Sequence, residues 1–311
     1  MDRRNFIKST LAIPLSMYSL KDFKQATEHL SPTGELMPVL FVGHGNPMNA
    51  IEDNEFSRGW ADMGKKISKP KAILCVSAHW QTSGTMVTAM PKPPTIHDFG
   101  GFPEKLFQAQ YPAPGAPELA KEITTTIKKT KVELDYDWGL DHGCWSVLLP
   151  MFPKADIPTF QLSLDYSQPP QYHFELANEL KALRKKGVLI IGSGNIVHNL
   201  SLFQMTDKAF DWAVEFDEKI KGFIEKGDYQ SVVDYKKLGK IAQLSVPTNE
   251  HYLPLLYSLA LHDKKEALSF FNARTTAGSV SMRSLKIGLK ITQKVISLTL
   301  KCWEKQYLWS L

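Results

Sequence analysis

Four short apolar runs divide the first two thirds of the chain. They cover residues 37–42, 71–77, 157–164 and 187–191 and are rich in valine, isoleucine, leucine and phenylalanine. Their apolar residues do not alternate regularly with polar ones, as they would in a strand with one face in water. Runs of this kind are typical of strands that are covered on both faces, which occur mainly in parallel sheets. The pattern therefore predicts four buried, mostly parallel strands.

Helical patterns lie between and after these runs. Residues 117–130 begin with a proline and a glutamate, which suit the first turn of a helix. In residues 174–186, leucines recur at four- and three-residue spacing and basic residues precede a terminal glycine. Residues 210–225 carry a similar apolar stripe. Strands that alternate with helices predict an α/β fold with a central, mostly parallel sheet flanked by helices.

The two ends of the chain are set apart from this pattern. Residues 1–35 contain Arg3 and Arg4 before a short apolar stretch, which resembles a twin-arginine export signal, although no clear cleavage site follows. A solvated N-terminal extension is the alternative interpretation. Residues 289–311 place apolar side chains on one face of an expected C-terminal helix. We expect a single catalytic domain over residues 36–288.

Composition narrows the class of protein. Of the 311 residues, 43% are hydrophobic and 22% are charged, which excludes a disordered, collagen-like or coiled-coil chain. No apolar stretch reaches the length of about 18 residues that a membrane-spanning helix needs. The net charge of +5 is spread out, so we expect no nucleic-acid partner. Cys75, Cys144 and Cys302 lie far apart and predict neither a disulfide framework nor a cysteine zinc site.

The strongest signal is where the histidines fall. His44, His79 and His198 each follow a predicted strand and are flanked by glycine, serine or asparagine. The carboxyl ends of parallel strands meet at one edge of a sheet, where open α/β proteins bind their ligands. His142, in a turn, and His251, at the start of a short predicted helix, are placed to join them. We therefore expect a shared histidine site.

Several kinds of chemistry suit such a cluster. Imidazole nitrogens bind both zinc and iron, and Glu250 is available as a carboxylate ligand. Ligand type alone does not decide between Fe²⁺ and Zn²⁺. A hydrolytic triad of Ser193, His142 and Asp141 can be written down, but the chain has no nucleophile-elbow motif to support it. A zinc-dependent hydrolase and a non-catalytic metal-binding protein remain open as alternatives.

Eight stretches match a known family. The chain resembles the class III, or LigB-type, extradiol ring-cleavage dioxygenases, most closely the 4,5-DOPA dioxygenase extradiol subfamily. The resemblance covers roughly residues 37–288. The matching stretches are 43–48 (GHGNPM), 77–80 (SAHW), 94–103 (PTIHDFGGFP), 111–115 (YPAPG), 141–145 (DHGCW), 193–199 (SGNIVHN), 250–257 (EHYLPLLY) and 278–284 (GSVSMRS).

The resemblance implies one α/β domain, one divalent metal ion per chain and the opening of a catechol ring by O2. It assigns His44 and His79 to metal-ligand positions and His251 to a further one. The wider family uses a carboxylate there, which keeps Glu250 as an alternative. His198 matches an acid–base histidine, or else a further ligand, and His142 matches a second active-site histidine.

The resemblance also implies a small-molecule catechol and O2 as partners and a cytoplasmic location. A working twin-arginine signal would instead imply the periplasm. The proline-rich loop of residues 91–117 is expected to fit the substrate, with Trp80, Phe99 and Phe102 offering aromatic stacking or else packing in the core. His97 in the same loop either faces the site or bonds within the loop. The oligomeric state is not implied.

Overall fold

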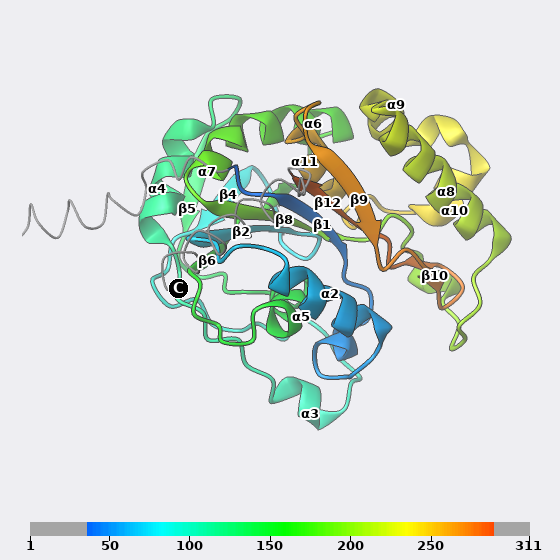
Figure 1. Ribbon diagram of the computed structural model, residues 1–311, viewed down its shortest axis with the longest axis horizontal. Helices are drawn as coiled ribbons and strands as arrows, with labels where there is room; N and C mark the ends of the chain where they lie inside the picture. Colours follow the sequence, from blue (N-terminus) through cyan, green and yellow to red (C-terminus); the bar gives the residue numbers. More distant parts are fainter. Residues whose placement is uncertain (1–35, 289–311) are drawn as a thin grey trace, which may run out of the picture.

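The computed structural model describes residues 36–288 (Figure 1). A central six-stranded sheet has the order β6-β2-β8-β1-β12-β9. Its strands, in sheet order, are β6 (Thr159–Gln161), β2 (Ala72–Ser77), β8 (Val188–Gly194), β1 (Val39–Gly43), β12 (Ser284–Gly288) and β9 (Ala267–Phe271). Three small pairs lie outside it: β3 (Gln81–Thr82) with β7 (Leu164–Asp165), β4 (Thr85–Thr88) with β5 (Val132–Asp135), and β10 (Thr275–Thr276) with β11 (Val280–Ser281).

Helices flank the sheet on both faces (Figure 1). They are α2 (Glu55–Lys65), α3 (Glu104–Phe107), α4 (Pro117–Thr126), α5 (His142–Met151), α6 (Pro170–Ala177), α7 (Lys181–Lys185), α8 (Asp211–Lys226), α9 (Tyr229–Val233), α10 (Lys240–Ser245) and α11 (Leu253–Ala260). Short 3-10 turns are η2 (Pro47–Ala50), η3 (Asn178–Leu180), η4 (Leu200–Leu202) and η5 (Tyr235–Leu238). The expected α/β fold is confirmed.

Successive residues along a strand pack on opposite faces of the sheet, as β1 shows. Along β1, Val39 and Phe41 pack into the hydrophobic cluster that contains α6, α8 and α11. Leu40 and Val42 pack into the opposite cluster, with α2 and α5. This alternation is the two-residue period of a strand, and it shows why the predicted runs are apolar throughout. The four parallel strands are thus covered on both faces.

The four predicted strands are confirmed, and β6, β2, β8 and β1 run parallel. The run at residues 157–164 is divided between β6 and β7. Two strands that the sequence pattern does not predict extend the sheet beyond β1: β12 pairs antiparallel with β1, and β9 pairs antiparallel with β12. The central sheet is therefore mixed, with its parallel part carrying the strand ends that matter for the site.

The helix expected over residues 174–186 is interrupted by η3 between α6 and α7. The side chain of Asn178 donates a hydrogen bond to the backbone oxygen of Phe174 at 2.9 Å. In an uninterrupted helix, that oxygen would accept from the backbone N–H of Asn178. Asparagine side chains compete with helical hydrogen bonds in this way, so the segment tightens locally into a 3-10 turn.

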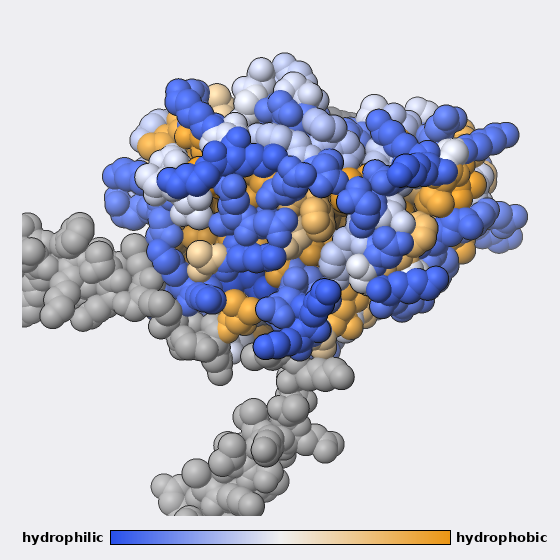
Figure 2. Space-filling view, turned by 90° about the horizontal axis from the view of Figure 1, so that it is seen from above, coloured by the Kyte–Doolittle hydropathy of each residue, from blue (hydrophilic) through white to orange (hydrophobic). Residues whose placement is uncertain are grey.

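The face of the molecule seen in Figure 2 is mostly hydrophilic, with small, separated hydrophobic areas. This is the surface expected where helices bury one side against a sheet. None of the helices within residues 36–288 has the length and hydropathy needed to cross a membrane. The twin-arginine-like segment at residues 1–35 and the helix predicted at residues 289–311 lie outside the described residues.

Candidate active site

The carboxyl ends of β1, β2 and β8 are level with one another. Gly43 at the end of β1 pairs with Gly194 on β8, and Ser77 at the end of β2 pairs with Ser193. His44 follows β1 directly, and His79 follows β2 after one residue. The parallel register therefore brings these two histidines to one edge, as the sequence pattern predicts.

His251 reaches the same edge from the segment before α11. Its backbone oxygen accepts a hydrogen bond from the N–H of Asn195 at 2.8 Å, just beyond the end of β8. A Cβ at Gly194 would lie 2.1 Å from this oxygen, so only glycine permits the approach. At Gly143, a Cβ would lie 2.4 Å from the Ser77 hydroxyl and 2.9 Å from the His79 ring. Glycines at the strand and helix ends thus make room for the histidines.

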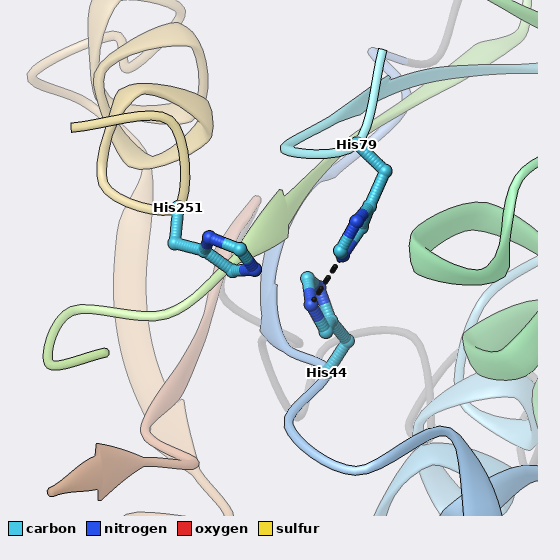
Figure 3. A group of neighbouring side chains, drawn as sticks. All are labelled: His44, His79 and His251. Carbon is cyan, nitrogen blue, oxygen red and sulfur yellow. Dashed lines mark hydrogen bonds between the residues drawn. The ribbon is translucent and has the colours of Figure 1, made fainter. Parts of the chain in front are cut away.

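The three imidazoles face a common point (Figure 3). Their ring centroids form a nearly equilateral triangle, with separations of 5.0 Å for His44–His79, 5.2 Å for His44–His251 and 5.0 Å for His79–His251. The Nε2 atoms of His44 and His79 are 3.1 Å apart. One nitrogen from each of the three rings lies within 4.8 Å of the others. Three imidazole nitrogens at this spacing can hold one divalent metal ion.

The outer nitrogens of two of these rings have partners that fix the tautomer. The Ser193 hydroxyl donates its one hydrogen to the backbone oxygen of Gly143, so it accepts from Nδ1 of His44 at 3.0 Å. The Glu250 carboxylate accepts from Nδ1 of His251 at 2.9 Å. In both rings the Nε2 lone pair is left for a metal, and such outer partners are typical of metal-binding histidines.

Glu250 therefore acts here as a partner of His251. Its carboxylate forms a possible metal group with His198 and His251, but it is not in the group with His44 and His79. His198 likewise belongs to the group with Glu250 and His251 and not to the group with His44 and His79. Its ring stacks on that of His251, with ring centroids 3.5 Å apart and planes inclined by 10°. The structure brings both residues to the site beside the triad of His44, His79 and His251.

Asp98 joins two histidines from the proline-rich loop. One carboxylate oxygen lies 2.9 Å from Nδ1 of His142 and 3.4 Å from Nδ1 of His79, and the other accepts from the backbone N–H of His142 at 2.8 Å. Sequence reasoning missed this residue, although it stands beside His97 in a family-matching stretch. Its carboxylate holds the ring of His79 on one side of the site and that of His142 on the other.

Asp98→Asn is expected to weaken divalent metal binding by roughly 10–100-fold, because the partner that orients His79 is then a poorer acceptor. A titration against a competing chelator measures this affinity. Asp62→Asn, which changes an exposed carboxylate paired with Lys65, is the control and should bind metal like the unaltered chain. A thermal melt of the metal-free proteins separates positioning from loss of structure. Unchanged affinity in Asp98→Asn would show that Asp98 does not position the ring.

Burial keeps these imidazoles neutral. It is the largest cause that lowers the pKa of His44 and of His251 well below the usual value, and the neighbouring histidines add to it. Burial, then His142, lowers the pKa of His79 to about 3. Burial lowers the pKa of His198 to about 4, although Glu250 opposes the shift. Near neutral pH the rings are therefore in the form that binds a metal or accepts a proton.

For Asp98, by contrast, the charged form is favoured. Burial alone would raise the pKa of this carboxyl, but the hydrogen bond and the charge of His142 outweigh it, and the pKa lies below its usual value. Asp98 is thus an anion at neutral pH. A carboxylate next to a cluster of neutral imidazoles supplies part of the negative charge that a divalent cation would meet there.

A cavity of about 480 Å³ opens onto the histidines. This is within the usual range for small-molecule sites. Phe99 and Phe102 line it and also pack against the hydrophobic cluster below, so each has features of both expected roles. Trp80 and His97 are not among its lining residues: Trp80 is buried and stacks on Trp138, and Nε2 of His97 bonds to the backbone oxygen of Ala109 at 2.9 Å. The complete lining is His44, Gly45, Asn46, Pro47, His79, Asp98, Phe99, Phe102, His142, His198, Leu200, Phe203, His251 and Val280.

The three residues considered above as a hydrolytic triad are not arranged as a Ser–His–Asp triad. The Ser193 hydroxyl contacts His44 and Gly143, and His142 pairs with Asp98. Asp141 instead accepts from the Ser77 hydroxyl at 2.6 Å and caps the start of α5. The structure therefore gives Ser193 no histidine–aspartate relay, and Asp141 has a structural role.

The family model of the catalytic LigB subunit of aromatic ring-opening dioxygenase matches residues 38–281. The chain belongs to the LigB family. This LigB chain is 46% identical over 261 residues to a protein of Escherichia coli K12 named 4,5-DOPA dioxygenase extradiol, covering 81% of this chain and 95% of the relative. A Mirabilis jalapa protein of the same name is 35% identical over 247 residues, covering 77% and 92%.

The fold of this LigB chain is also found in a solved structure. The crystal structure of an uncharacterized protein from Escherichia coli K12 matches it with a TM-score of 0.72 and 42% sequence identity. The match covers 81% of this chain and all of the other chain. The predicted family membership is confirmed by these comparisons together.

Proposed function

We propose that this protein is an extradiol dioxygenase, which opens the ring of a DOPA-like catechol with O2 by 4,5-cleavage. The observation that carries the proposal is the triangle of His44, His79 and His251 at the floor of a cavity lined by phenylalanines. The LigB family model and the names of the relatives support the same activity. The triad would hold one divalent ion per chain, Fe²⁺ or Zn²⁺, with Fe²⁺ as the choice for oxygen chemistry.

When bound, the metal supplies Lewis acidity toward the catechol oxygens and an electron path between catechol and O2. The remaining steps fall to the chain itself. Phe99 and Phe102 offer aromatic faces and edges to the planar ring and displace water from it. The catechol is then held in one orientation over the triad, which removes the entropy cost of bringing the reactants together.

His198 is placed to handle the proton of a catechol hydroxyl. Its neutral ring lines the cavity and is stacked on His251. A ring nitrogen of His198 accepts this proton, and returns it as the ring opens. His142 lines the cavity as well, with Nδ1 held by Asp98, so its Nε2 is the atom available to a substrate oxygen. These two histidines divide proton transfer and substrate orientation between them.

The test compares reloaded forms of the purified protein. After the metal is removed with a chelator, Fe²⁺ or Zn²⁺ is added and O2 uptake is followed with DOPA and with unsubstituted catechol. We expect the Fe²⁺ form to consume O2 and to produce a yellow ring-opened product. Zinc-dependent, oxygen-independent hydrolysis would support the hydrolase alternative. Stoichiometric metal binding without turnover of any catechol would identify a metal-binding protein and overturn the proposal.

A further inference from the structure

One polar side chain that lines the cavity, that of Asn46, has no part in the function proposed above. The other polar side chains in the lining belong to the triad and to Asp98, His142 and His198. The remaining lining residues have no polar side-chain atoms: they are Gly45, Pro47, Phe99, Phe102, Leu200, Phe203 and Val280. Asn46 is therefore the lining side chain left to recognise a polar group of the substrate that does not bind the metal.

Asn46 lies where the cavity opens to solvent. His44, two residues earlier, belongs to the triad and is 1% exposed, whereas Asn46 is exposed. Gly45, between them, lines the cavity as well. This short segment therefore runs from the triad to the rim. When the two oxygens of a catechol face the triad, a substituent on the far side of the ring extends toward solvent, and so toward this rim.

The amide of Asn46 is held by one hydrogen bond. Its Oδ1 accepts from the backbone N–H of Met48 at 2.9 Å. Because a backbone N–H can only donate, this bond identifies the amide oxygen and, with it, the position of Nδ2. Within residues 36–288, Nδ2 itself has no hydrogen-bond acceptor. Both of its N–H groups are therefore available to an acceptor on a molecule in the cavity.

Resting on the function proposed above, we propose that Asn46 binds the carboxylate of the substrate's ring substituent and is the residue that favours carboxylate-bearing, DOPA-like catechols. A carboxylate accepts hydrogen bonds only, and a hydrogen bond to a charged group is stronger than one between neutral groups. A bound divalent ion attracts a carboxylate anywhere in the cavity. The bond to Asn46 also requires a particular position and direction, so it selects where the carboxylate lies on the substrate.

The test compares dihydrocaffeate with propylcatechol on the Fe²⁺-loaded full chain, because their three-carbon chains differ only in the carboxylate. Asn46→Ser keeps an oxygen that can accept from Met48 but has no amide N–H. We expect it to lower the ratio of kcat/KM for dihydrocaffeate to that for propylcatechol roughly 10–100-fold, mainly through a higher KM for dihydrocaffeate. DOPA should follow dihydrocaffeate. This substitution changes no charge, so the attraction of the metal ion is the same in both proteins.

Asn46→Asp is the second variant. Aspartate has the shape and the accepting oxygen of asparagine, but it has no N–H and it repels a carboxylate, so the ratio should fall further than in Asn46→Ser. Gln204→Glu is its matched control. It makes the same amide-to-carboxylate change on an exposed side chain that does not line the cavity, and it should keep the ratio of the unaltered chain. Thermal melts of the three variants report on folding.

Three results would overturn the inference. The first is an unchanged ratio in Asn46→Ser. The second is an equal response to Asn46→Asp and Gln204→Glu, because net charge would then explain the effect. The third is an equal loss of kcat/KM for both probes in Asn46→Ser, which would show that Asn46 supports the structure of the site and does not contact the carboxylate.

Failure of this inference differs from failure of the proposed function. Anaerobic titration of the Zn²⁺-loaded full chain gives Kd for both probes without turnover, and Asn46→Ser should weaken the binding of dihydrocaffeate alone. If unsubstituted catechol is opened but the Asn46 variants leave the ratio unchanged, the function stands and the carboxylate contact falls. If no catechol is opened under any loading, the function itself falls, and the Kd values still decide whether Asn46 binds the carboxylate.

Discussion

His198→Ala is expected to bind metal with the stoichiometry of the unaltered chain and to open catechols about 10²–10⁴-fold more slowly, the usual cost of losing a general acid–base group. The physical reason is its position: the His198 ring lines the cavity beside the triad and is not needed to complete it. Metal analysis after dialysis and oxygen uptake under saturating catechol measure the two effects separately.

His262→Ala controls for the loss of an imidazole in general. His262 contacts Tyr229 and does not line the cavity, so both metal content and turnover should be preserved. If His198→Ala loses metal together with activity, His198 completes the metal sphere and its role as an acid–base group is wrong. Full activity in His198→Ala would remove it from the mechanism altogether.

His251→Ala is expected to abolish both metal binding and turnover, because two imidazoles remain where three are needed. Glu250→Gln is the companion variant. It keeps a hydrogen-bonding partner near Nδ1 of His251 but removes the negative charge, so metal should bind about 10–100-fold more weakly at unchanged stoichiometry. Metal content and chelator competition distinguish the two results.

The opposite pattern would reassign the ligand. If Glu250→Gln is metal-free while His251→Ala keeps its metal, the carboxylate is the third ligand. This is the arrangement that the resemblance implies for the wider family. The pair of variants therefore decides a question that the sequence leaves open.

The sequence predicts well the parallel strands that carry this site. Apolar runs that are buried on both faces mark β1, β2 and β8, and their parallel register places His44 and His79 at one edge. The strands β12 and β9, which pair antiparallel with each other, escape prediction. The five residues of β12 include a serine, a lysine and a glycine, so its place in the sheet follows from pairing with β1 and not from its own pattern.

Side-chain directions in the loops are harder to predict. Phe99 and Phe102 reach the cavity, whereas His97, from the same loop, bonds to the backbone of Ala109. A proline-rich loop has no fixed period, so tertiary contacts decide which residues face inward. Asp98 escaped notice for this reason. The ligand assignment came from the family resemblance, because spacing along the chain does not choose between His251 and Glu250.

The histidine triangle also bears on when, during synthesis, the protein could acquire the proposed metal ion. His44 and His251 are separated by most of the domain, and β1 completes its pairing only when β8 and β12 have been made. A nascent chain that ends before residue 251 offers no three-histidine pocket of this geometry. Under the proposed function, the ion is therefore expected to bind only after residue 251 has been synthesised and the long-range contacts of the sheet have closed.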